Sequence, residues 1–282
     1  MSKILEKVVL SQLVSHLNSN SIFSNVQSAY RPRHNSETAL LRVVNDLISA
    51  LERLQSSLSL PCLAAFDTID HDILLHRLQH VFGIHETALL WFKSYLLNRT
   101  QIMPANGIHS SPVDLCCGVP QGSVLGPVLF ILYTQPLSSG IDHHPVSHQL
   151  YADNTEIYKS SHPTEVEATT QGIERCISDL QSWMTCNKLH MNDDKTEAIL
   201  ITTQILSHSH PLSQTINISN TNIKFKQPVR NLCVTINSTL SLRQHVMKIC
   251  KAAYLELRRI NSIRKYLSVD ATKTLVCSLL LT

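Results

Sequence analysis

The spacing of apolar residues changes along the chain between helical and strand-like patterns, which predicts a mixed fold. Apolar residues recur every three or four positions over 4–17 and over 36–54, so two amphipathic helices are expected, the second capped by Ser36. The short apolar run 58–66 is typical of a buried strand, although Pro61 in its middle cannot donate a ladder hydrogen bond. Further helices are expected over 70–78, where Asp70 is the cap, and over 86–97.

The middle of the chain carries clearer turn signals. Asn106-Gly107 predicts a hairpin between 101–105 and 108–115. The Gly/Pro-rich stretch 118–127 leads into an apolar helix over 123–137, and short strands flank Asp153. The remaining pattern predicts a helix over 164–187, a strand over 197–202, a loop over 207–213, short strands over 215–219, 223–226 and 232–236, and helices over 242–263 and 269–281.

Together these elements predict an α+β fold with helices covering one side of a mainly antiparallel sheet. The chain of 282 residues is 43% apolar and 16% charged, which describes a globular protein. Its net charge of +3 neither requires nor excludes a nucleic-acid partner. The eight cysteines form no C-x-x-C pair, and we interpret them as reduced, mostly buried thiols of an intracellular protein.

Neither a targeting segment nor a membrane span is predicted. Residues 1–17 carry Lys3, Glu6 and Lys7 among apolar positions, as an amphipathic helix does and a signal peptide does not. The longest apolar run, 124–133, is far shorter than the roughly 20 residues that a membrane helix needs. A cytoplasmic or nuclear protein without a membrane partner is therefore expected.

The most specific chemistry lies in two neighbouring segments. Tyr151-Ala152-Asp153-Asn154 reads as a tight turn that presents an aspartate at its tip, and it follows the loop 118–127 by about thirty residues. An aspartate above a sheet, beside a loop rich in backbone N–H groups, is a candidate site for Mg²⁺ and phosphate.

Both segments resemble the reverse transcriptase domain of non-LTR (LINE-type) retrotransposons, whose active-site turn reads Tyr-Ala-Asp-Asp. Further segments resemble motifs of that family in the same order, over nearly the whole chain: 5–9, 30–40, 64–71, 91–96, 192–197 and 231–235. The resemblance implies a right-hand polymerase fold, with a fingers-like part at 1–57, a palm with interleaved fingers elements at 58–227, and the primer grip and a partial thumb at 228–282. It also implies a truncated, degenerate copy.

The family activity is RNA-templated DNA synthesis with Mg²⁺, dNTPs, an RNA template and a DNA primer. Two Mg²⁺ about 3.5–4 Å apart repel each other, so the protein must hold them with carboxylates. The family uses three. Its strand pattern Leu-Asp-Leu-Ser-Ala-Ala-Phe-Asp aligns with 60–67, so one metal-binding aspartate falls on Pro61, and the second aspartate of the turn is Asn154. Asp153 is the one that remains. Asp67 lies six residues farther along the strand, about 20 Å away, which is too far to replace the aspartate lost at Pro61.

Other positions keep the family pattern. By resemblance, Phe66 and Ala65 bind the substrate, with Phe66 as the steric gate that would exclude a ribose 2′-OH, and Gln121 and Gly122 lie near the template and the incoming nucleotide. Lys195 matches the lysine proposed to protonate pyrophosphate. The residues alone also allow ordinary roles: a core phenylalanine, a helix-start turn and a solvated lysine.

Several basic residues are candidates for phosphate contacts. Arg31 and Arg33 flank a proline in a loop and could contact the template or the triphosphate, or could simply be solvated. Six basic residues in the last two helices suit either a thumb that grips duplex or a soluble helix face: Lys248, Lys251, Arg258, Arg259, Arg264 and Lys265.

Losing two of three metal carboxylates predicts an inactive or severely impaired polymerase. Two alternatives stay open: a non-catalytic remnant that binds nucleic acid, and a translated fragment without function. Cys233 stands where the family has glycine in its primer-grip motif, and a Cβ there has a cost if that position needs a positive φ.

Overall fold

A computed structural model gives the fold of the chain. It describes residues 2–31, 33–63, 69–105, 108–120, 122–192, 196–203, 215–218 and 221–280, with side chains omitted at 2, 61–63, 104, 105, 108 and 280. Within these residues, none of the helices is long and apolar enough to cross a membrane.

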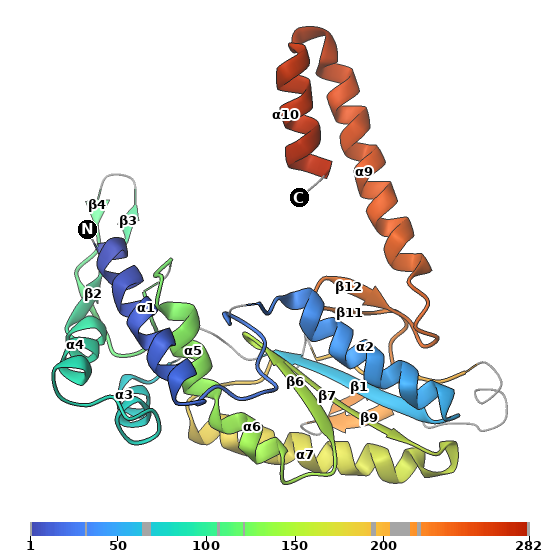
Figure 1. Ribbon diagram of the computed structural model, residues 1–282, viewed down its shortest axis with the longest axis horizontal. Helices are drawn as coiled ribbons and strands as arrows, with labels where there is room; N and C mark the ends of the chain where they lie inside the picture. Colours follow the sequence, from blue (N-terminus) through green and yellow to red (C-terminus); the bar gives the residue numbers. More distant parts are fainter. Residues whose placement is uncertain are drawn as a thin grey trace.

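A four-stranded antiparallel sheet lies at the centre of the molecule (Figure 1). Its order is β6-β7-β1-β8, formed by β6 (Ser147–Tyr151), β7 (Asn154–Ser161), β1 (Ser56–Leu63) and β8 (Ile199–Ile201). In the β1–β7 ladder, Leu63 pairs with Asn154 and Pro61 pairs with Glu156. The expected strands around Asp153 and at 197–202 are therefore confirmed.

Both faces of this sheet are covered. On one face, Leu58, Leu60 and Ile157 join the main core, which also contains apolar residues of α5 (Gly126–Thr134), α6 (Pro136–Ile141) and α7 (Val166–Cys186). On the other face, α2 (Ser36–Glu52) packs Val43 and Leu47 against Tyr158, Ile199 and Ile201. The prediction of helices on one side was wrong because α2, whose apolar stripe needs a partner, covers the second face.

Pro61 is accommodated by the short length of β8. Within the described residues, β8 pairs with β1 only from Ser57 to Ser59, whereas β7 pairs with β1 over its whole length. Position 61 therefore has β7 as its one neighbour, and prolines are tolerated where a strand has an open edge.

A second group of elements lies beside the sheet and includes the N-terminal helix α1 (Ser2–Ser19), α3 (His71–His80) and α4 (Glu86–Leu96). The predicted hairpin is present as two short ladders, β2 (Arg99–Gln101) with β5 (Val113–Leu115) and β3 (Pro104–Ala105) with β4 (Ile108–His109). Its turn residues 106 and 107 lie outside the described residues.

The C-terminal part contains two hairpins and two long helices. The hairpins are β9 (Thr215–Ile218) with β10 (Thr221–Lys224), and β11 (Val229–Asn231) with β12 (Val234–Ile236). The helices α9 (Arg243–Ile263) and α10 (Val269–Leu280) were predicted, and they project together from the rest of the molecule (Figure 1). Two 3₁₀ turns, η2 (Pro163–Glu165) and η4 (Arg264–Tyr266), adjoin α7 and α9.

Several local predictions need correction. Asn35, not Ser36, caps α2, because its side chain accepts the N–H of Thr38. The helix predicted over 123–137 begins at Gly126 and is followed by a second helix that starts at Pro136. Residues 232 and 233 form a turn rather than a strand, with φ of +41° at Leu232 and +71° at Cys233. Of the seven described cysteines Cys176 is buried and the other six are exposed, so the prediction of mostly buried thiols was wrong.

Candidate active site

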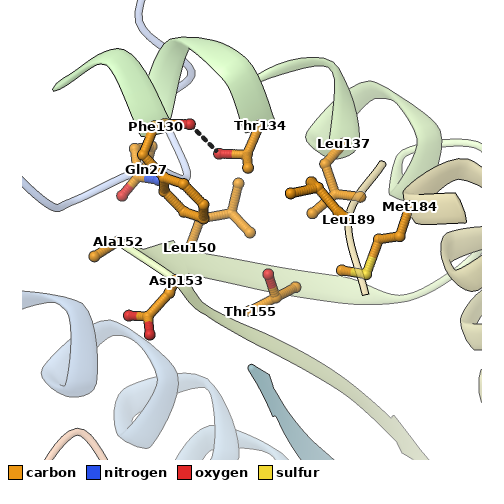
Figure 2. A pocket seen from close by; sticks show the side chains of 10 residues that line it. All are labelled: Gln27, Phe130, Thr134, Leu137, Leu150, Ala152, Asp153, Thr155, Met184 and Leu189. Carbon is orange, nitrogen blue, oxygen red and sulfur yellow. Dashed lines mark hydrogen bonds between the residues drawn. The ribbon is translucent and has the colours of Figure 1, made fainter. Parts of the chain in front are cut away.

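Asp153 occupies the tip of the β6–β7 hairpin, as predicted. Tyr151 pairs with Asn154, which leaves Ala152 and Asp153 as the two turn residues. Ala152 has a φ of +54°, and positive φ at the first turn residue is the signature of a type II′ turn. Figure 2 shows the carboxylate of Asp153 directed away from the small apolar cavity behind the turn, where Phe130 and Leu150 lie. The backbone therefore presents this carboxylate outward from the core.

A loop from the N-terminal part lies along the edge strand β6 and reaches the turn. The N–H of Leu150 donates to the carbonyl of Val26 at 2.8 Å, and the N–H of Ser28 donates to the carbonyl of Leu150 at 3.0 Å. This pairing brings Tyr30 near Asp153. The pKa of the Tyr30 phenol is raised, mainly by partial burial and to a smaller extent by electrostatic repulsion from Tyr151 and Asp153. Tyr30 remains 49% exposed, so it borders the open side of the site.

The two arginines of this loop differ in their contacts. Arg31 donates through Nη1 to the carbonyls of Ser24 at 2.8 Å and Gln27 at 3.0 Å, and its guanidinium lies 5.4 Å from the centre of the Phe23 ring. Arg31 thus holds its own loop together. Arg33 is exposed, with a φ of +63°. A phosphate contact by either arginine stays a prediction.

The Gly/Pro-rich loop is fixed from two sides. The N–H of Gly118 donates to the carbonyl of Ile69 at 2.7 Å, and the N–H of Val124 donates to the buried carboxylate of Glu6 at 2.7 Å. Gly122 is exposed and has a φ of +71°, which a residue with a Cβ adopts only with strain. Gly126 has a different requirement, because a Cβ there would lie 2.7 Å from Ser123 Oγ.

Asn154 takes part in a buried chain of hydrogen bonds. Its Nδ2 donates to Oδ1 of Asn231 at 3.3 Å, and Nδ2 of Asn231 donates to Oε2 of Glu156. Ser59 donates to Oε1 of Glu156 at 2.7 Å. Burial raises the pKa of Glu156, and the hydrogen bonds from Ser59 and Asn231 partly oppose that shift. The chain connects β1, β7 and the β11–β12 hairpin.

The described residues do not fit a pair of Mg²⁺ ions. Within the part of the chain that the structure describes, no three His, Cys, Asp or Glu side chains gather at one place. Asp153 provides one carboxylate, and Asn154 provides a neutral amide whose buried Oδ1 accepts no hydrogen bond from the residues that the structure describes. Both oxygens of Glu156 already accept protein hydrogen bonds. One available carboxylate is too little charge to hold two divalent cations together.

Some predicted site residues cannot be located. Ala65, Phe66, Asp67, Gln121 and Lys195 lie outside the described residues, and Pro61 is described by its backbone only. Their assignments stay predictions.

Sequence reasoning missed three residues at this site: Tyr30, Glu156 and Asn231. The strand pattern contained a signal for Glu156, since a period of two places it on the same sheet face as Asn154. Asn231 begins the motif segment 231–235, but the sequence could not predict its contact with Glu156, because the two residues are 75 positions apart in the chain.

Comparison with known proteins identifies related sequences. A family model described as "Reverse transcriptase (RNA-dependent DNA polymerase)" matches residues 1–236. The RNA-directed DNA polymerase from mobile element jockey of Drosophila melanogaster is 25% identical over 268 residues, which is 93% of this chain and 28% of that protein. The probable RNA-directed DNA polymerase from transposon BS of the same species is 24% identical over 282 residues, covering 98% of this chain and 30% of that protein.

The chain thus spans about 30% of the length of these curated relatives. Among solved structures, apo telomerase from Candida tropicalis, truncated from the C-terminal domain, aligns with a TM-score of 0.55 at 15% identity, over 86% of this chain and 45% of that one. Telomerase from Candida albicans, in complex with a fragment of telomeric RNA, aligns with a TM-score of 0.56 at 11% identity, over 86% of this chain and 39% of that one. These likenesses show that the fold is the right-hand polymerase fold.

Proposed function

The chain belongs to the reverse transcriptase (RNA-dependent DNA polymerase) family, and we propose from this premise that it binds a primed template but has lost most or all nucleotidyl transfer. Its relatives place it with the reverse-transcriptase-like domains of non-LTR retrotransposons. The proposed partners are an RNA template, a DNA primer and dNTP, and Mg²⁺ is proposed to bind poorly. Residues 1–57, 58–227 and 228–282 are proposed as fingers-like part, palm, and primer grip with partial thumb.

One observation supports the loss of catalysis. At the three family positions for metal carboxylates, the chain has Pro61, Asp153 and Asn154. The nearby acid Glu156 is 4% exposed and has both oxygens engaged. Removing one preorganised hydrogen-bond donor from an active site commonly costs about 10²–10³-fold in rate, roughly 2.7–4 kcal/mol, and the loss of a metal carboxylate should cost at least as much. Two such losses would reduce turnover below ordinary detection.

The proposed binding has separate support. The six basic residues of the C-terminal helices and η4 are all exposed: Lys248, Lys251, Arg258, Arg259, Arg264 and Lys265. Of these, Arg259 forms an ion pair with Glu256 at 2.6 Å. A cationic hairpin that projects from the palm could follow the phosphate backbone of a duplex, as a thumb does.

The test combines two measurements on the purified protein. Anisotropy of a labelled RNA–DNA primer–template should show binding that weakens with salt, with a log–log slope of about −0.9 for each phosphate neutralised. Lys251→Glu with Arg258→Glu should reduce that slope, whereas Lys7→Glu on the exposed face of α1 should not. Primer extension with dNTPs and Mg²⁺ or Mn²⁺ should give no product.

Extension that disappears in Asp153→Ala would disprove the loss of catalysis. Binding that does not depend on salt would disprove the proposed mode of binding. A thermal melt without a cooperative transition would favour the remaining alternative, a fragment without function.

A further inference from the structure

The hydrogen-bonded chain around Glu156 has a fixed direction. Ser59 Oγ and Asn231 Nδ2 each donate to one oxygen of the carboxylate, and Asn154 Nδ2 donates to Asn231 Oδ1. Asn231 therefore uses both ends of its amide, and a carboxylate at 156 requires the NH₂ group of Asn231 to face Glu156 rather than Asn154. Asn231 in turn requires a donor at position 154.

Three of the four residues of this chain are buried, and Asn154 is partly exposed. Ser59, Glu156 and Asn231 are 3%, 4% and 2% exposed. The hydrogen bonds of this chain favour one arrangement, and the low dielectric around its buried members makes a mismatched partner costly. The residue at position 154 is therefore constrained by Glu156, although the two side chains are joined only through Asn231.

Position 61 is constrained by the same carboxylate. Residues directly opposite each other in an antiparallel pair share a face, with Cβ atoms about 4.5–5.5 Å apart. Pro61 is the direct partner of Glu156, so an aspartate introduced at 61 would project beside a buried negative charge. Like charges this close destabilise one another, and each weakens the ionisation of the other.

We infer that Glu156 is a positioning residue that holds Asn154 and Asn231 in a structural hydrogen-bonded chain. This chain occupies the place where restored metal carboxylates at 61 and 154 would have to lie. This inference rests on the proposed loss of metal binding. Its consequence is specific: the two family aspartates cannot be restored at 61 and 154 while position 156 accepts the hydrogen bond of Asn231 Nδ2.

The change Glu156→Gln should remove the conflict, because an amide at 156 allows the chain to reverse. The new NH₂ group can donate to Asn231 Oδ1 while its carbonyl still accepts from Ser59. Asn231 Nδ2 then faces position 154 and can donate to the carboxylate of an Asn154→Asp variant. Aspartate at 154 is thus incompatible with glutamate at 156, whereas it is compatible with glutamine at 156.

The experiment compares Pro61→Asp/Asn154→Asp with the same double variant carrying Glu156→Gln. Mn²⁺ binding is followed by the EPR signal of the free ion, and primer extension is measured alongside. The triple variant should bind Mn²⁺ about tenfold tighter or better, because the reversed chain lets Asn231 Nδ2 hold the carboxylate at 154 in place, and one such hydrogen bond is worth about a factor of ten. Extension should appear in the triple variant only.

The matched control is the double variant Pro61→Asp/Asn154→Asp that carries Glu197→Gln in place of Glu156→Gln. Glu197 Oε2 accepts the N–H of Arg230 at 3.3 Å, so it contacts the same β11–β12 hairpin without belonging to the buried chain. If Glu197→Gln restored Mn²⁺ binding and extension equally well, a change in net charge would explain the effect, and the inference would be overturned. Equal Mn²⁺ affinity and extension in the double and triple variants would also overturn it.

A second measurement covers variants that fold poorly. Asn154→Asp alone should lower the melting temperature without metal, and adding Glu156→Gln should recover at least about half of that loss, as coupled neighbours do. No loss, or no recovery, would overturn the inference. Extension by the unmodified protein would instead disprove the proposed function, so the two failures can be told apart.

Discussion

The carboxylate of Glu6 accepts the backbone N–H of Val124 at 2.7 Å, although the two residues are 118 positions apart. Glu6 lies on α1 and is only 5% exposed, and Tyr95 donates to the same oxygen at 3.4 Å. A residue that reads in sequence as part of a polar helix face thus fixes the start of α5. The position of the loop that precedes α5 depends in part on this contact.

We predict that Glu6→Ala lowers the free energy of unfolding by about 2 kcal/mol, because it leaves the N–H of Val124 without its acceptor. Glu6→Gln should cost less, since its amide oxygen can still accept. Lys7→Ala, at the exposed neighbouring position, should change stability by less than about 0.5 kcal/mol. Urea unfolding followed by circular dichroism measures all three, and a cost for Lys7→Ala equal to that of Glu6→Ala would contradict the assignment.

Gly122 and Gly140 should respond oppositely to alanine. A Cβ at either position would meet no atom within 4 Å, but Gly122 has a φ of +71° whereas Gly140 lies in helix α6. Gly122→Ala should therefore destabilise by about 1 kcal/mol, from backbone strain alone. Gly140→Ala should stabilise by about 0.5–1 kcal/mol, since it restricts the unfolded chain. Chemical denaturation measures the free energy of unfolding of both variants. A change of the same sign in both would disprove the prediction.

The pattern of apolar residues predicted most of the helices and strands because each amphipathic segment buries a face of its own period. It did not predict which face of the sheet each helix covers, and α2 is the example: its stripe through Val43 and Leu47 fits either face equally well. The cap of α2 was misplaced by one residue because Asn35 and Ser36 are both good caps, and only the backbone geometry selects Asn35.

At the candidate site, the motif predicted the turn that carries Asp153 because four consecutive residues define it. The network around Glu156 could not be predicted, since it joins side chains of three elements that meet only in the folded state. The β11–β12 turn was also missed as a turn. Leu232-Cys233 lacks the Asn or Gly that normally marks two residues of positive φ.

His148 should make the fold sensitive to mild acid. Its side chain is 6% exposed, and its Nε2 lies 2.9 Å from Ser138 Oγ. Burial lowers its pKa and Arg42 lowers it further, while Asp142 at 3.9 Å opposes the shift. Since the folded pKa lies below the unfolded value of about 6.5, protonation favours the unfolded chain. This contribution to stability is present above pH 6.5 and is lost as the pH falls through the folded pKa.

His148→Gln removes this titration and leaves the other histidines unchanged. The stability of the unmodified protein relative to the variant should therefore fall between pH 7.5 and pH 5. Thermal melts at matched ionic strength measure the difference, in which the remaining histidines cancel. A difference that is constant over this range would show that His148 does not drive the acid sensitivity.

Cys233→Gly, which introduces the glycine that the family has at this position, should stabilise the protein. Cys233 has a φ of +71° and is exposed, so its side chain contributes strain and little packing. Relief of a left-handed conformation is worth about 1–2 kcal/mol, and the greater freedom of glycine in the unfolded chain offsets roughly half of that. The net gain should be about 0.5–1 kcal/mol.

Cys233→Ala is the matched control because it removes the thiol and keeps the Cβ. It should leave stability nearly unchanged, and Leu232→Gly, at a φ of +41°, should behave like Cys233→Gly. Urea unfolding of the three variants separates backbone strain from loss of the thiol. A gain in Cys233→Ala as large as that in Cys233→Gly would locate the cost in the sulfur atom, and the β11–β12 turn would then not be a strained element of this chain.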